Sequence, residues 1–442
     1  MTAPVPLEGW GRHPRHACRL LRPRGVEGLR AALAAGPVIA RGNGRAYGDS
    51  AMNRAATLDM RGFDRMLAFD PATGVLEAEA GVLLADIITA FLPRGWFPAV
   101  TPGTKFVTLG GMIAADVHGK NHHRDGSLRQ FLDWVEVMGP DGAVTRHAAG
   151  SDGFDWTVGG MGLTGIILRA GMRLRPVRSG WIAQRTLPTA DLAGAMEVFE
   201  ANADAPYSVA WIDVLTPPPR LGRSLVMLGA HAEPEDLPAG RRADPFAVPR
   251  RRARQVPVDA PGILLSAPLM RGFNALYHAR GSRRAGAALV DWDSYFYPLD
   301  ALLGWNRIYG RRGFVQFQCA LPLAASRAGL QALLQRIAGS GQGAFLAVLK
   351  RFGPGAGRFS FPMEGYTLAL DFPATPRALA LMDELDRITL DHGGRFYLAK
   401  DARMSAATLR ASDARVAGFA AHRRQVGADG AFASAQSQRL EL

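Results

Sequence analysis

The chain has 442 residues, too many for one ordinary hydrophobic core, and its 48% apolar and 21% charged residues are typical of a globular protein. Lysine and arginine number 52 against 39 acidic residues, and the net charge of +13 favours an anionic partner: nucleic acid, an anionic membrane surface or a phosphorylated ligand. Two cysteines, Cys18 and Cys319, exclude a disulfide framework, and no run approaches the ~18 apolar residues that span a bilayer. Residues 1–23 lack the apolar run of a secretion signal, so we expect a cytoplasmic protein or one peripheral to a membrane, on either side of it.

Short runs of β-type composition alternate with glycine turns between residues 1 and 177. Asp86 resembles an N-cap and Pro93 ends the pattern, so we predict a helix over 86–92. The turn PDG at 140–142 separates two strand-like runs and predicts a β-hairpin. The sequence pattern changes near Val177, where we expect a domain boundary.

Helical and strand-like stretches alternate between residues 178 and 394. Helical patterns cover 192–203, 327–340 and 378–394, while RRGFVQFQCALP, AFLAVLKRFG and YTLALDFP have strand patterns. This alternation predicts an α+β domain whose helices pack on an antiparallel sheet. Arg241–Gln255, rich in arginine and proline, predicts a mobile basic loop that is either a docking element or a solvated surface loop.

Three glycine-rich turns, each attached to a strand, lie at 40–50, 102–111 and 158–166. Glycine lets backbone N–H groups approach an anion closely, although any one such loop is more often a plain turn. The first does not open a helix and is therefore no dinucleotide fingerprint. Three turns in one domain can converge on an extended cofactor with a pyrophosphate.

The motifs ARGNGRAYGDS, PGTKFVTLGG, AADVHGKNHH and GGMGLTGI resemble the FAD domain of the vanillyl-alcohol-oxidase-type (PCMH-type) flavoproteins. Within that superfamily, SVAWID, GFVQFQ, AVLKRFGP and YLAKDAR are similar to the decaprenylphosphoryl-β-D-ribose 2′-oxidases. The resemblance covers nearly the whole chain. It implies a two-domain α+β fold: an FAD-binding domain over 1–177, a substrate-binding domain on an antiparallel sheet over 178–394, and a segment over 395–442 that returns to the FAD domain.

The resemblance also implies the roles of individual residues. Lys400 and Lys120 are the expected catalytic residues. The residues expected to line the substrate cavity are Lys120, Trp211, Phe296, Gln316, Gln318, Lys350, Ala369 and Lys400. The residues expected to bind FAD are Gly42, Asn43, Gly44, Arg45, Ala46, Tyr47, Gly103, Thr104, Thr108, Gly110, Gly111, Asp116, His118, Gly119, Ile166 and Tyr397.

Elementary chemistry agrees with a lysine at such a site. Oxidation of an alcohol by a flavin removes the hydroxyl proton and leaves negative charge, which a fixed cation stabilises. The general base stays open between Lys400, if its pKa is depressed, and a histidine of HGKNHH. Taken without the family, Lys400 more readily pairs with Asp401 or Asp371, and Trp211 is a core tryptophan. Gln316 and Gln318 lie two apart on a strand and share a face, as pocket residues or as solvated glutamines. No metal is expected, because HxxxHH lacks a partner carboxylate or cysteine motif.

The sequence departs from the family at several positions. Arg45 stands where many relatives carry the histidine that tethers FAD, so we expect FAD to be bound non-covalently. Ala369 replaces the active-site cysteine of the family, so inhibitors that trap that cysteine should form no bond here. Thr367 replaces an asparagine, and Phe296 stands where an aromatic hydroxyl is expected, with Tyr297 adjacent.

The favoured function is therefore oxidation of the ribose C2 hydroxyl of a polyprenyl-phosphoryl-β-D-ribose to the 2′-keto sugar. A separate short-chain NAD(P)H-dependent reductase would complete an epimerisation to the arabinose form used in cell-envelope polysaccharides, and an anionic membrane surface is a further partner. One alternative is a soluble sugar or alditol oxidase. The other is a basic polyanion-binding protein with a vestigial flavin site, although no nucleic-acid motif appears and we expect no nucleic acid as partner.

Overall fold

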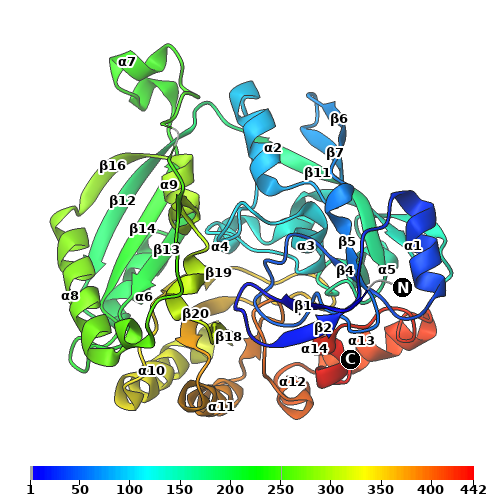
Figure 1. Ribbon diagram of the computed structural model, residues 1–442. Coiled ribbons are helices and arrows are strands. Elements are labelled where there is room, and N and C mark those ends of the chain that lie inside the picture. Colours follow the sequence, from blue (N-terminus) through cyan, green and yellow to red (C-terminus); the bar gives the residue numbers. More distant parts are fainter. Residues whose placement is uncertain (1–2, 250) are drawn as a thin grey trace.

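The computed structural model describes residues 3–249 and 251–442, and Figure 1 shows them as two sheet-based layers that meet at the centre of the molecule. The first layer contains a mixed-length antiparallel sheet in the order β10-β9-β11-β7-β6, with β8 paired to β11. Its helices include α3, which packs against β11 and β7. The elements are β6 (Met66–Asp70), β7 (Val75–Glu79), α2 (Leu84–Phe91), β8 (Trp96–Pro98), α3 (Leu109–Ala114), α4 (His122–Asp125), β9 (Leu132–Met138), β10 (Val144–Ala148), α5 (Asp152–Thr157) and β11 (Ile166–Pro176).

A small parallel sheet, β3-β5-β4, adjoins this layer and carries the first glycine-rich loop at the end of β4. The loop begins where β4 ends at Arg41, so the strand fixes its starting point. The elements are β1 (Val5–Glu8), β2 (Arg15–Cys18), β3 (Leu20–Leu21), α1 (Gly25–Ala34), β4 (Ile39–Arg41) and β5 (Thr57–Asp59).

The second layer is an eight-stranded sheet in the order β16-β12-β14-β13-β19-β20-β18-β21. All of its pairings are antiparallel, as the sequence pattern predicts. Its strands are β12 (Trp181–Thr189), β13 (Tyr207–Ile212), β14 (Ser224–His231), β16 (Gly286–Asp291), β18 (Phe314–Pro322), β19 (Ala347–Phe352), β20 (Gly365–Pro373) and β21 (Arg395–Phe396).

The two faces of this sheet have different partners. Residues such as Phe317, Leu368 and Leu370 share a buried apolar cluster with the helices α10 and α11. The alternate residues of the same strands point toward the first layer, because successive side chains of a strand point to opposite faces. The helices and short strands of this part are α6 (Leu192–Ala201), α7 (Ala239–Arg242), β15 (Arg254–Gln255), α8 (Ala267–Arg283), α9 (Trp292–Phe296), β17 (Leu302–Leu303), α10 (Leu323–Ser340) and α11 (Pro376–Asp391).

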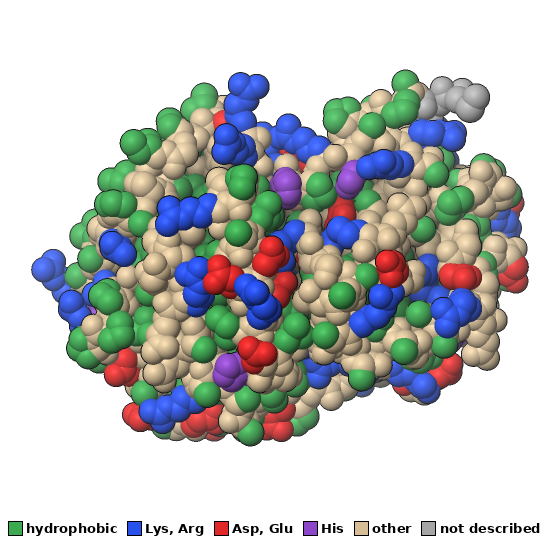
Figure 2. Space-filling model, turned by 90° about the horizontal axis from the view of Figure 1, so that it is seen from below, with side chains coloured by type: hydrophobic (Ala, Val, Ile, Leu, Met, Phe, Trp, Pro, Cys, Tyr) green, Lys and Arg blue, Asp and Glu red, His purple; other side chains and the backbone are tan. Residues whose placement is uncertain are grey.

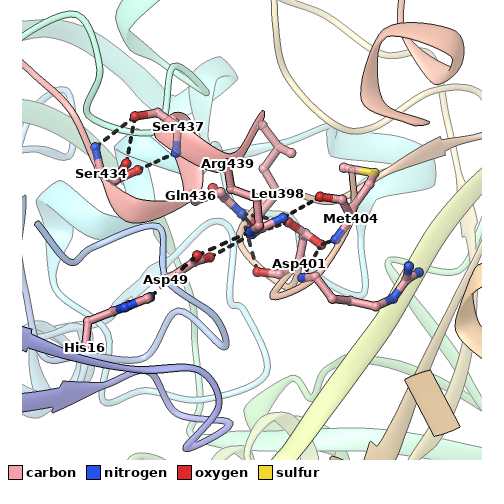
Figure 3. Close-up of polar contacts among 10 residues, drawn as sticks. His16, Asp49, Leu398, Asp401, Met404, Ser434, Gln436, Ser437 and Arg439 are labelled. Atoms are coloured by element: carbon pink, nitrogen blue, oxygen red, sulfur yellow. Dashed lines mark hydrogen bonds and ion pairs between the residues drawn. The ribbon is translucent and has the colours of Figure 1, made fainter. Parts of the chain in front are cut away.

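The C-terminal segment returns to the first layer, where its red helices lie beside the blue N-terminal strands in Figure 1. They are α12 (Ala406–Ser412), α13 (Arg415–Gln425) and α14 (Ala435–Leu440). Figure 3 shows that Arg439 lies between two carboxylates, 2.8 Å from Asp49 and 2.9 Å from Asp401. Arg439 also donates to the carbonyl oxygen of Met404 at 2.6 Å. These contacts join α14 to the first loop and to the turn that follows Lys400.

The structure confirms most of the predicted elements and corrects several details. The hairpin forms as β9 and β10, and the three predicted helices of the second region form as α6, α10 and α11. The helix predicted over 86–92 begins earlier, at Leu84, so Asp86 lies in its first turn and not at its N-cap. Within the basic stretch, whose residue 250 lies outside the described residues, Arg251 donates to the carbonyl oxygens of Asp293 and Tyr297. No helix in the described ranges is long and apolar enough to cross a membrane.

Candidate active site

A cavity of about 280 Å³ lies between the glycine-rich loops of the first layer and the facing side of the eight-stranded sheet. Its wall comes from stretches that are far apart in the sequence: 40–51, 102–118, 161–167, alternate residues of β18, β19 and β20, and 397–400. The cavity therefore exists only where both layers and the returning segment meet. All three glycine-rich turns of the sequence contribute to this one wall, as their pattern predicts.

The first two loops touch each other directly. The side-chain amide nitrogen of Asn43 donates to the backbone carbonyl oxygen of Phe106 at 2.8 Å. A Cβ at position 42 would collide with the Oγ1 of Thr108, so glycine is required for this close approach. Gly44 has φ +63°, a conformation that glycine adopts freely. The contact leaves the backbone of both loops uncovered on the cavity side.

The returning segment closes the other end of the first loop. The backbone N–H of Tyr47 donates to the carbonyl oxygen of Ala399 at 3.0 Å. The Lys400 ammonium lies 3.6 Å from the centre of the Tyr47 ring, and the Arg45 guanidinium lies 4.0 Å from the Trp10 ring. Aromatic faces attract cations, so both positive charges are held against the wall without a carboxylate partner.

One face of the large sheet supplies the opposite wall. Gln318 pairs with Ala369, which pairs with Val348, so these three side chains form a row across β18, β20 and β19. A second row places Thr367 beside Lys350. The rows line the cavity because every second residue of each strand points toward it.

Asp371 lies behind this wall beside Gln316, its cross-strand partner. The amide of Gln316 donates to one carboxylate oxygen of Asp371, and the Tyr309 hydroxyl donates to the other at 3.4 Å. Burial raises the pKa of Asp371, and burial lowers the pKa of Lys400. The charge of each group opposes the pKa shift of the other, although the two are not in ion-pair contact.

His118 is held as a neutral ring. The amide nitrogen of Gln318 lies 3.2 Å from its Nε2 and 3.3 Å from the hydroxyl of Thr367, which itself donates to the carbonyl oxygen of Cys319. The Gln318 amide therefore donates to Nε2, which accepts. Burial and the neighbouring ammonium of Lys350 lower the pKa of His118 well below its usual value. The ring packs 5.1 Å from that of Tyr397.

The wall is rich in positive charge. Arg45, Lys350 and Lys400 line it, and Lys120 lies close to Lys350. Among the residues that the structure describes, none of these four nitrogen groups has a carboxylate oxygen within 4.0 Å. Burial lowers the pKa of Lys350 to about 8, and burial together with the Lys350 charge lowers the pKa of Lys120 to about 7. Unpaired cations so close together favour an anionic ligand.

Most of the residues predicted from the sequence lie on this wall. The predicted residues on the wall are Gly42, Asn43, Gly44, Arg45, Ala46, Tyr47, Gly103, Thr104, Thr108, Gly110, Gly111, His118, Gln316, Gln318, Lys350, Ala369, Tyr397 and Lys400.

Three predicted cofactor residues lie outside the wall, and the structure corrects their placement. Asp116 is fully buried behind it, where it accepts from Ser127 at 2.8 Å and Ser360 at 2.5 Å and so ties loops together. Gly119 lies beyond the turn, against Asn121. Ile166 points into a core cluster, while Ile167, its neighbour on β11, lines the cavity.

Three predicted substrate residues also lie outside the wall. The Lys120 ammonium is 4.1 Å from the centre of the Tyr295 ring and donates to the Tyr295 carbonyl oxygen. Phe296 is 2% exposed and packs in an aromatic core, 4.9 Å from the Tyr207 ring. Trp211 pairs with Val348 on the cavity side of the sheet, but its ring is covered by that of Tyr277 at 4.8 Å.

Among the residues that sequence reasoning missed, Trp10 and Asp371 bear most directly on the charges of the site. Trp10, from the N-terminal segment, lines the cavity under Arg45, and no local motif marks it. Asp371 was considered only as a plain partner for Lys400. The alternation of YTLALDFP could have identified it, because Asp371 lies two residues after Ala369 and shares its face.

Comparison with known proteins agrees with this geometry. Residues 22–148 match a family model described as FAD binding domain. The decaprenylphosphoryl-beta-D-ribose oxidase of Mycolicibacterium smegmatis is 36% identical over 99% of this chain and 97% of its own length. An uncharacterized protein in the mprA 5′ region of Streptomyces coelicolor is 34% identical over 81% of this chain and 99% of its own. The D-lactate dehydrogenase of Anaerostipes hadrus is 26% identical over 26% of this chain and 25% of its own.

The two-layer fold and the loop-lined cavity define an FAD-dependent oxidoreductase of the PCMH-type flavoproteins. The chain belongs to the decaprenylphosphoryl-β-D-ribose oxidase family, because its similarity to the Mycolicibacterium smegmatis protein extends over nearly the full length of both chains.

The residues of the wall fit an FAD molecule. The paired loops at Gly42 and Thr108 present uncovered backbone, and the buried Nε of Arg45 has no hydrogen-bond partner. The side-chain oxygen of Gln316 is likewise buried without a partner and is free to accept from a ligand. Cationic and N–H donors at one end with an amide at the other suit a molecule that joins a pyrophosphate to a polar ring.

We expect denaturation of the protein to release FAD as an unmodified molecule. The first loop carries Arg45 and no histidine or cysteine between 41 and 51, and an arginine forms no flavin bond. Acid or heat treatment of the yellow protein, followed by filtration, should put essentially all of the flavin absorbance in the filtrate. Flavin mass retained on a peptide that contains His118, the one histidine among the described wall residues, would contradict this expectation.

We expect Ala369→Cys to create an accessible thiol in the cavity. Ala369 lines the wall, whereas Cys18 and Cys319 are completely buried. Burial raises the pKa of Cys319 to about 12, which keeps it an unreactive thiol. A maleimide should therefore label the folded variant once and the natural chain not at all, as measured by intact mass. If the folded variant carried no more label than the natural chain, residue 369 would not face the cavity.

Proposed function

We propose that this chain oxidises the C2 hydroxyl of the ribose in a polyprenyl-phosphoryl-β-D-ribose to the 2′-keto sugar, with FAD as the electron acceptor. The observation that carries the proposal is that the buried Lys400, with Asp371 behind it, lines the same cavity as the ammonium of Lys350. The first two groups suit an alcohol that loses a proton, and the third suits the phosphate of the same molecule.

We propose that residues 1–177 and 395–442 together form the FAD-binding unit and that residues 178–394 form the substrate-binding unit. The hydrogen bond from Tyr47 to Ala399 and the ion pairs of Arg439 support the first grouping. The antiparallel sheet that starts with β12 supports the second.

The cofactor would be held by the loops at 42–47 and 103–111, by the turn at 161–167, and by Tyr397 beneath His118. Bound FAD supplies a two-electron acceptor. The Tyr397 hydroxyl donates to the carbonyl oxygen of Ala115 at 3.0 Å, and its ring stacks on Phe361, so the side chain is fixed before any ligand arrives. Such preorganisation avoids an ordering cost on binding.

The hydroxyl proton of the substrate would pass to the pair of Lys400 and Asp371. Burial brings the amine and the carboxyl closer in pKa, so the pair can take up a proton near neutral pH. The histidines are less suitable bases. His118 already accepts from Gln318 at Nε2, and burial lowers the pKa of His122 to about 3.

Lys350, which lines the cavity, would bind the substrate phosphate, and Lys120 would add positive charge from behind the wall. The charge of Lys350 contributes to the lowered pKa of Lys120, and neither ammonium has a carboxylate partner in the described part of the chain. An anion beside Lys350 offsets the repulsion and favours the protonated forms of both. This places Lys350 at the phosphate and leaves the reacting hydroxyl to Lys400.

We expect substrate affinity to fall as the pH rises through about 7 to 8. The two ammoniums are charged below those pKa values and neutral above them, and the phosphate needs the charged forms. The KM for the phosphorylated substrate should rise by about tenfold between pH 7 and pH 9. Lys350→Arg, which stays charged, should flatten the rise, and a phosphate-free sugar should show none of it. An unchanged pH profile in the arginine variant would refute the assignment of Lys350.

The 2′-keto product would be a substrate for a reductase that delivers hydride from the opposite face of the sugar. We propose a short-chain NAD(P)H-dependent enzyme as this partner, because reduction of a ketone needs a hydride donor that the oxidase does not supply. Together the two reactions would invert C2 and give the arabinose form.

Anaerobic titration of the yellow protein tests the function. A polyprenyl-phosphoryl-β-D-ribose should bleach the flavin absorbance with one equivalent per active site, and mass spectrometry should find a product lighter by two hydrogens. The matched 2-deoxy sugar has no hydroxyl at C2 and should leave the spectrum oxidised. Bleaching by free pentitols, with none by the lipid-linked ribose, would instead identify a soluble-sugar oxidase.

A further inference from the structure

Helix α8, at the outer edge of the large sheet in Figure 1, carries large apolar side chains on its solvent side. Leu269, Phe273 and Leu276 are spaced four and three residues apart and so share one side of the helix. The turn at Gly262–Leu265 just before the helix adds Ile263, which is 71% exposed, and Leu276 is 69% exposed. We call Ile263, Leu264, Leu269, Phe273, Leu276 and Tyr277 the apolar stripe.

Single exposed leucines are ordinary, but a contiguous apolar surface of this kind marks an interaction site. The stripe is not covered by any other element in the described structure, since its members remain between 41% and 71% exposed. What covers it must therefore come from outside the chain.

Arginines accompany the apolar stripe along the sequence, and we call the exposed ones of residues 251–284 the arginine border. Between residues 251 and 284 the sequence holds seven arginines and a single acidic residue, Asp259. Asp259 is already paired with Arg12 and Arg307. Six of the seven, all except Arg251, are exposed, and none of these forms an ion pair within the described residues. The exposed arginines are Arg252, Arg254, Arg271, Arg280, Arg283 and Arg284.

Figure 2 shows basic and acidic side chains interspersed over the face seen from below, where α10, α11 and α12 lie. Ion pairs such as Arg336–Glu384 and Arg403–Asp383 neutralise charge there. Exposed arginines without an ion pair also occur elsewhere in the described residues, for example Arg312 and Arg387. The segment 251–284 differs because it combines six such arginines with a single acidic residue, which is already paired.

Aromatic contacts connect the stripe with the substrate side of the cavity. Tyr277 packs on Trp211, whose strand partner Val348 lines the cavity. Phe273 packs 5.8 Å from Phe345, the residue before Leu346 of the wall. An apolar route thus leads from the cavity wall to the surface.

We propose that the apolar stripe and its arginine border rest on the surface of an anionic bilayer and hold the cavity beside the lipid phase. Exposed apolar side chains insert at the boundary of headgroups and acyl chains, and each arginine near such a surface strengthens binding about fivefold. Only the biological role of this surface rests on the proposed function: it would let a prenyl tail stay in the lipid while the attached sugar enters the cavity.

A second copy of this chain fits the stripe less well. A two-fold contact places the same patch of both copies together, so arginine border would face arginine border. Anionic headgroups, in contrast, complement that border over its whole length.

Vesicle flotation of the FAD-loaded enzyme tests the proposal. Vesicles of phosphatidylcholine with about one third phosphatidylglycerol should carry the protein upward, and vesicles of phosphatidylcholine alone should not. Ile263→Ser combined with Leu276→Ser should weaken binding at least about tenfold, because two inserted side chains are lost. Arg280→Glu combined with Arg283→Glu should weaken it by a similar factor or more.

The matched control is Leu67→Ser combined with Leu323→Ser, two leucines that are 40% and 42% exposed on β6 and α10. This variant should bind vesicles like the natural chain. Flavin absorbance and melting temperature show that each variant is folded. No binding to the anionic vesicles, or equal binding by all variants, would overturn the proposal. The proposal would also be overturned if light scattering showed a dimer that dissociates into monomers when Ile263→Ser is combined with Leu276→Ser.

The outcome is independent of the reaction. A protein that floats with anionic vesicles but bleaches with no ribosyl lipid would keep the membrane surface and lose the proposed substrate. A protein that oxidises the ribosyl lipid in detergent but never floats would keep the function and lose this surface.

Discussion

Replacement of Lys400 by methionine should lower kcat by about 10²- to 10⁴-fold, the range expected for loss of a positioned acid–base group. Methionine keeps the length and apolar stem of lysine but cannot accept a proton or complement Asp371. Stopped-flow measurement of flavin bleaching under anaerobic conditions isolates the step that the substitution affects. FAD content should stay near one per chain. The ammonium of Lys400 contacts the ring of Tyr47 by a cation–π interaction, and its loss should not disrupt the first loop.

Lys400→Arg distinguishes the two roles that a cation at this position can play. Arginine supplies a positive charge but does not give up its proton at accessible pH. If Lys400 takes the substrate proton, the arginine variant should be as slow as the methionine variant. In the natural chain, the bleaching rate should fall as the pH drops, since the pair with Asp371 then becomes fully protonated. Recovery of most of the rate in the arginine variant would show that charge alone is required.

Replacement of Arg439 by methionine should lower the free energy of unfolding by about 3–5 kcal/mol, as for other buried ion pairs that lose one partner. The substitution leaves the carboxylates of Asp49 and Asp401, both less than 10% exposed, without their shared cation. The turn that carries Lys400 would then keep only the hydrogen bonds of Gln436 as its link to α14. Urea unfolding monitored by circular dichroism gives the stability, and flavin content shows whether the site still assembles.

The pH dependence of this effect has a defined sign. Burial acts to raise the pKa of Asp401, but Arg439 and the backbone N–H groups of Arg403 and Met404 outweigh it and leave the pKa below its usual value. A carboxyl with a lowered pKa stabilises the fold above its unfolded pKa of about 4, and the stabilisation disappears as the pH falls through the folded value. The natural chain should therefore lose stability on acidification below about pH 4 more steeply than the variant.

Arg410→Met is the matched control, since Arg410 pairs with Glu441 in the same C-terminal segment but both side chains are more than half exposed. An exposed pair contributes about 0–1 kcal/mol, so this variant should unfold almost like the natural chain. Equal destabilisation by the two substitutions would mean that the returning segment is held by something other than the burial of its charges.

The sequence was sufficient to predict those parts of the fold and site that depend on short-range patterns. Strand alternation predicted that Gln316 and Gln318 share a face, and both line the cavity. The PDG turn predicted the hairpin of β9 and β10. Glycine spacing predicted that three loops meet, because only glycine permits the approach that Gly42 makes to Thr108.

Long-range packing could not be predicted in the same way. Trp211 lies on the cavity side of the sheet, yet α8 covers it, and α8 itself was not predicted because Pro268, Gly272 and Gly281 weaken its helical pattern. The role of Arg439 depends on two carboxylates 38 and 390 residues away in the sequence. No local composition rule identifies such partners.

The row of side chains across β18, β20 and β19 separates two tasks within the same strands. Residues 318, 369 and 348 face the ligand, while their immediate neighbours, such as Phe317, Leu368 and Leu349, build the core with α10 and α11. Substitutions at every second position can therefore accumulate in a lineage, or be combined in a library, without disturbing the scaffold. Ala369, whose small side chain lines the cavity, is where an engineer would begin to retune selectivity, whereas Thr367 also hydrogen-bonds to Gln318 and to the carbonyl oxygen of Cys319.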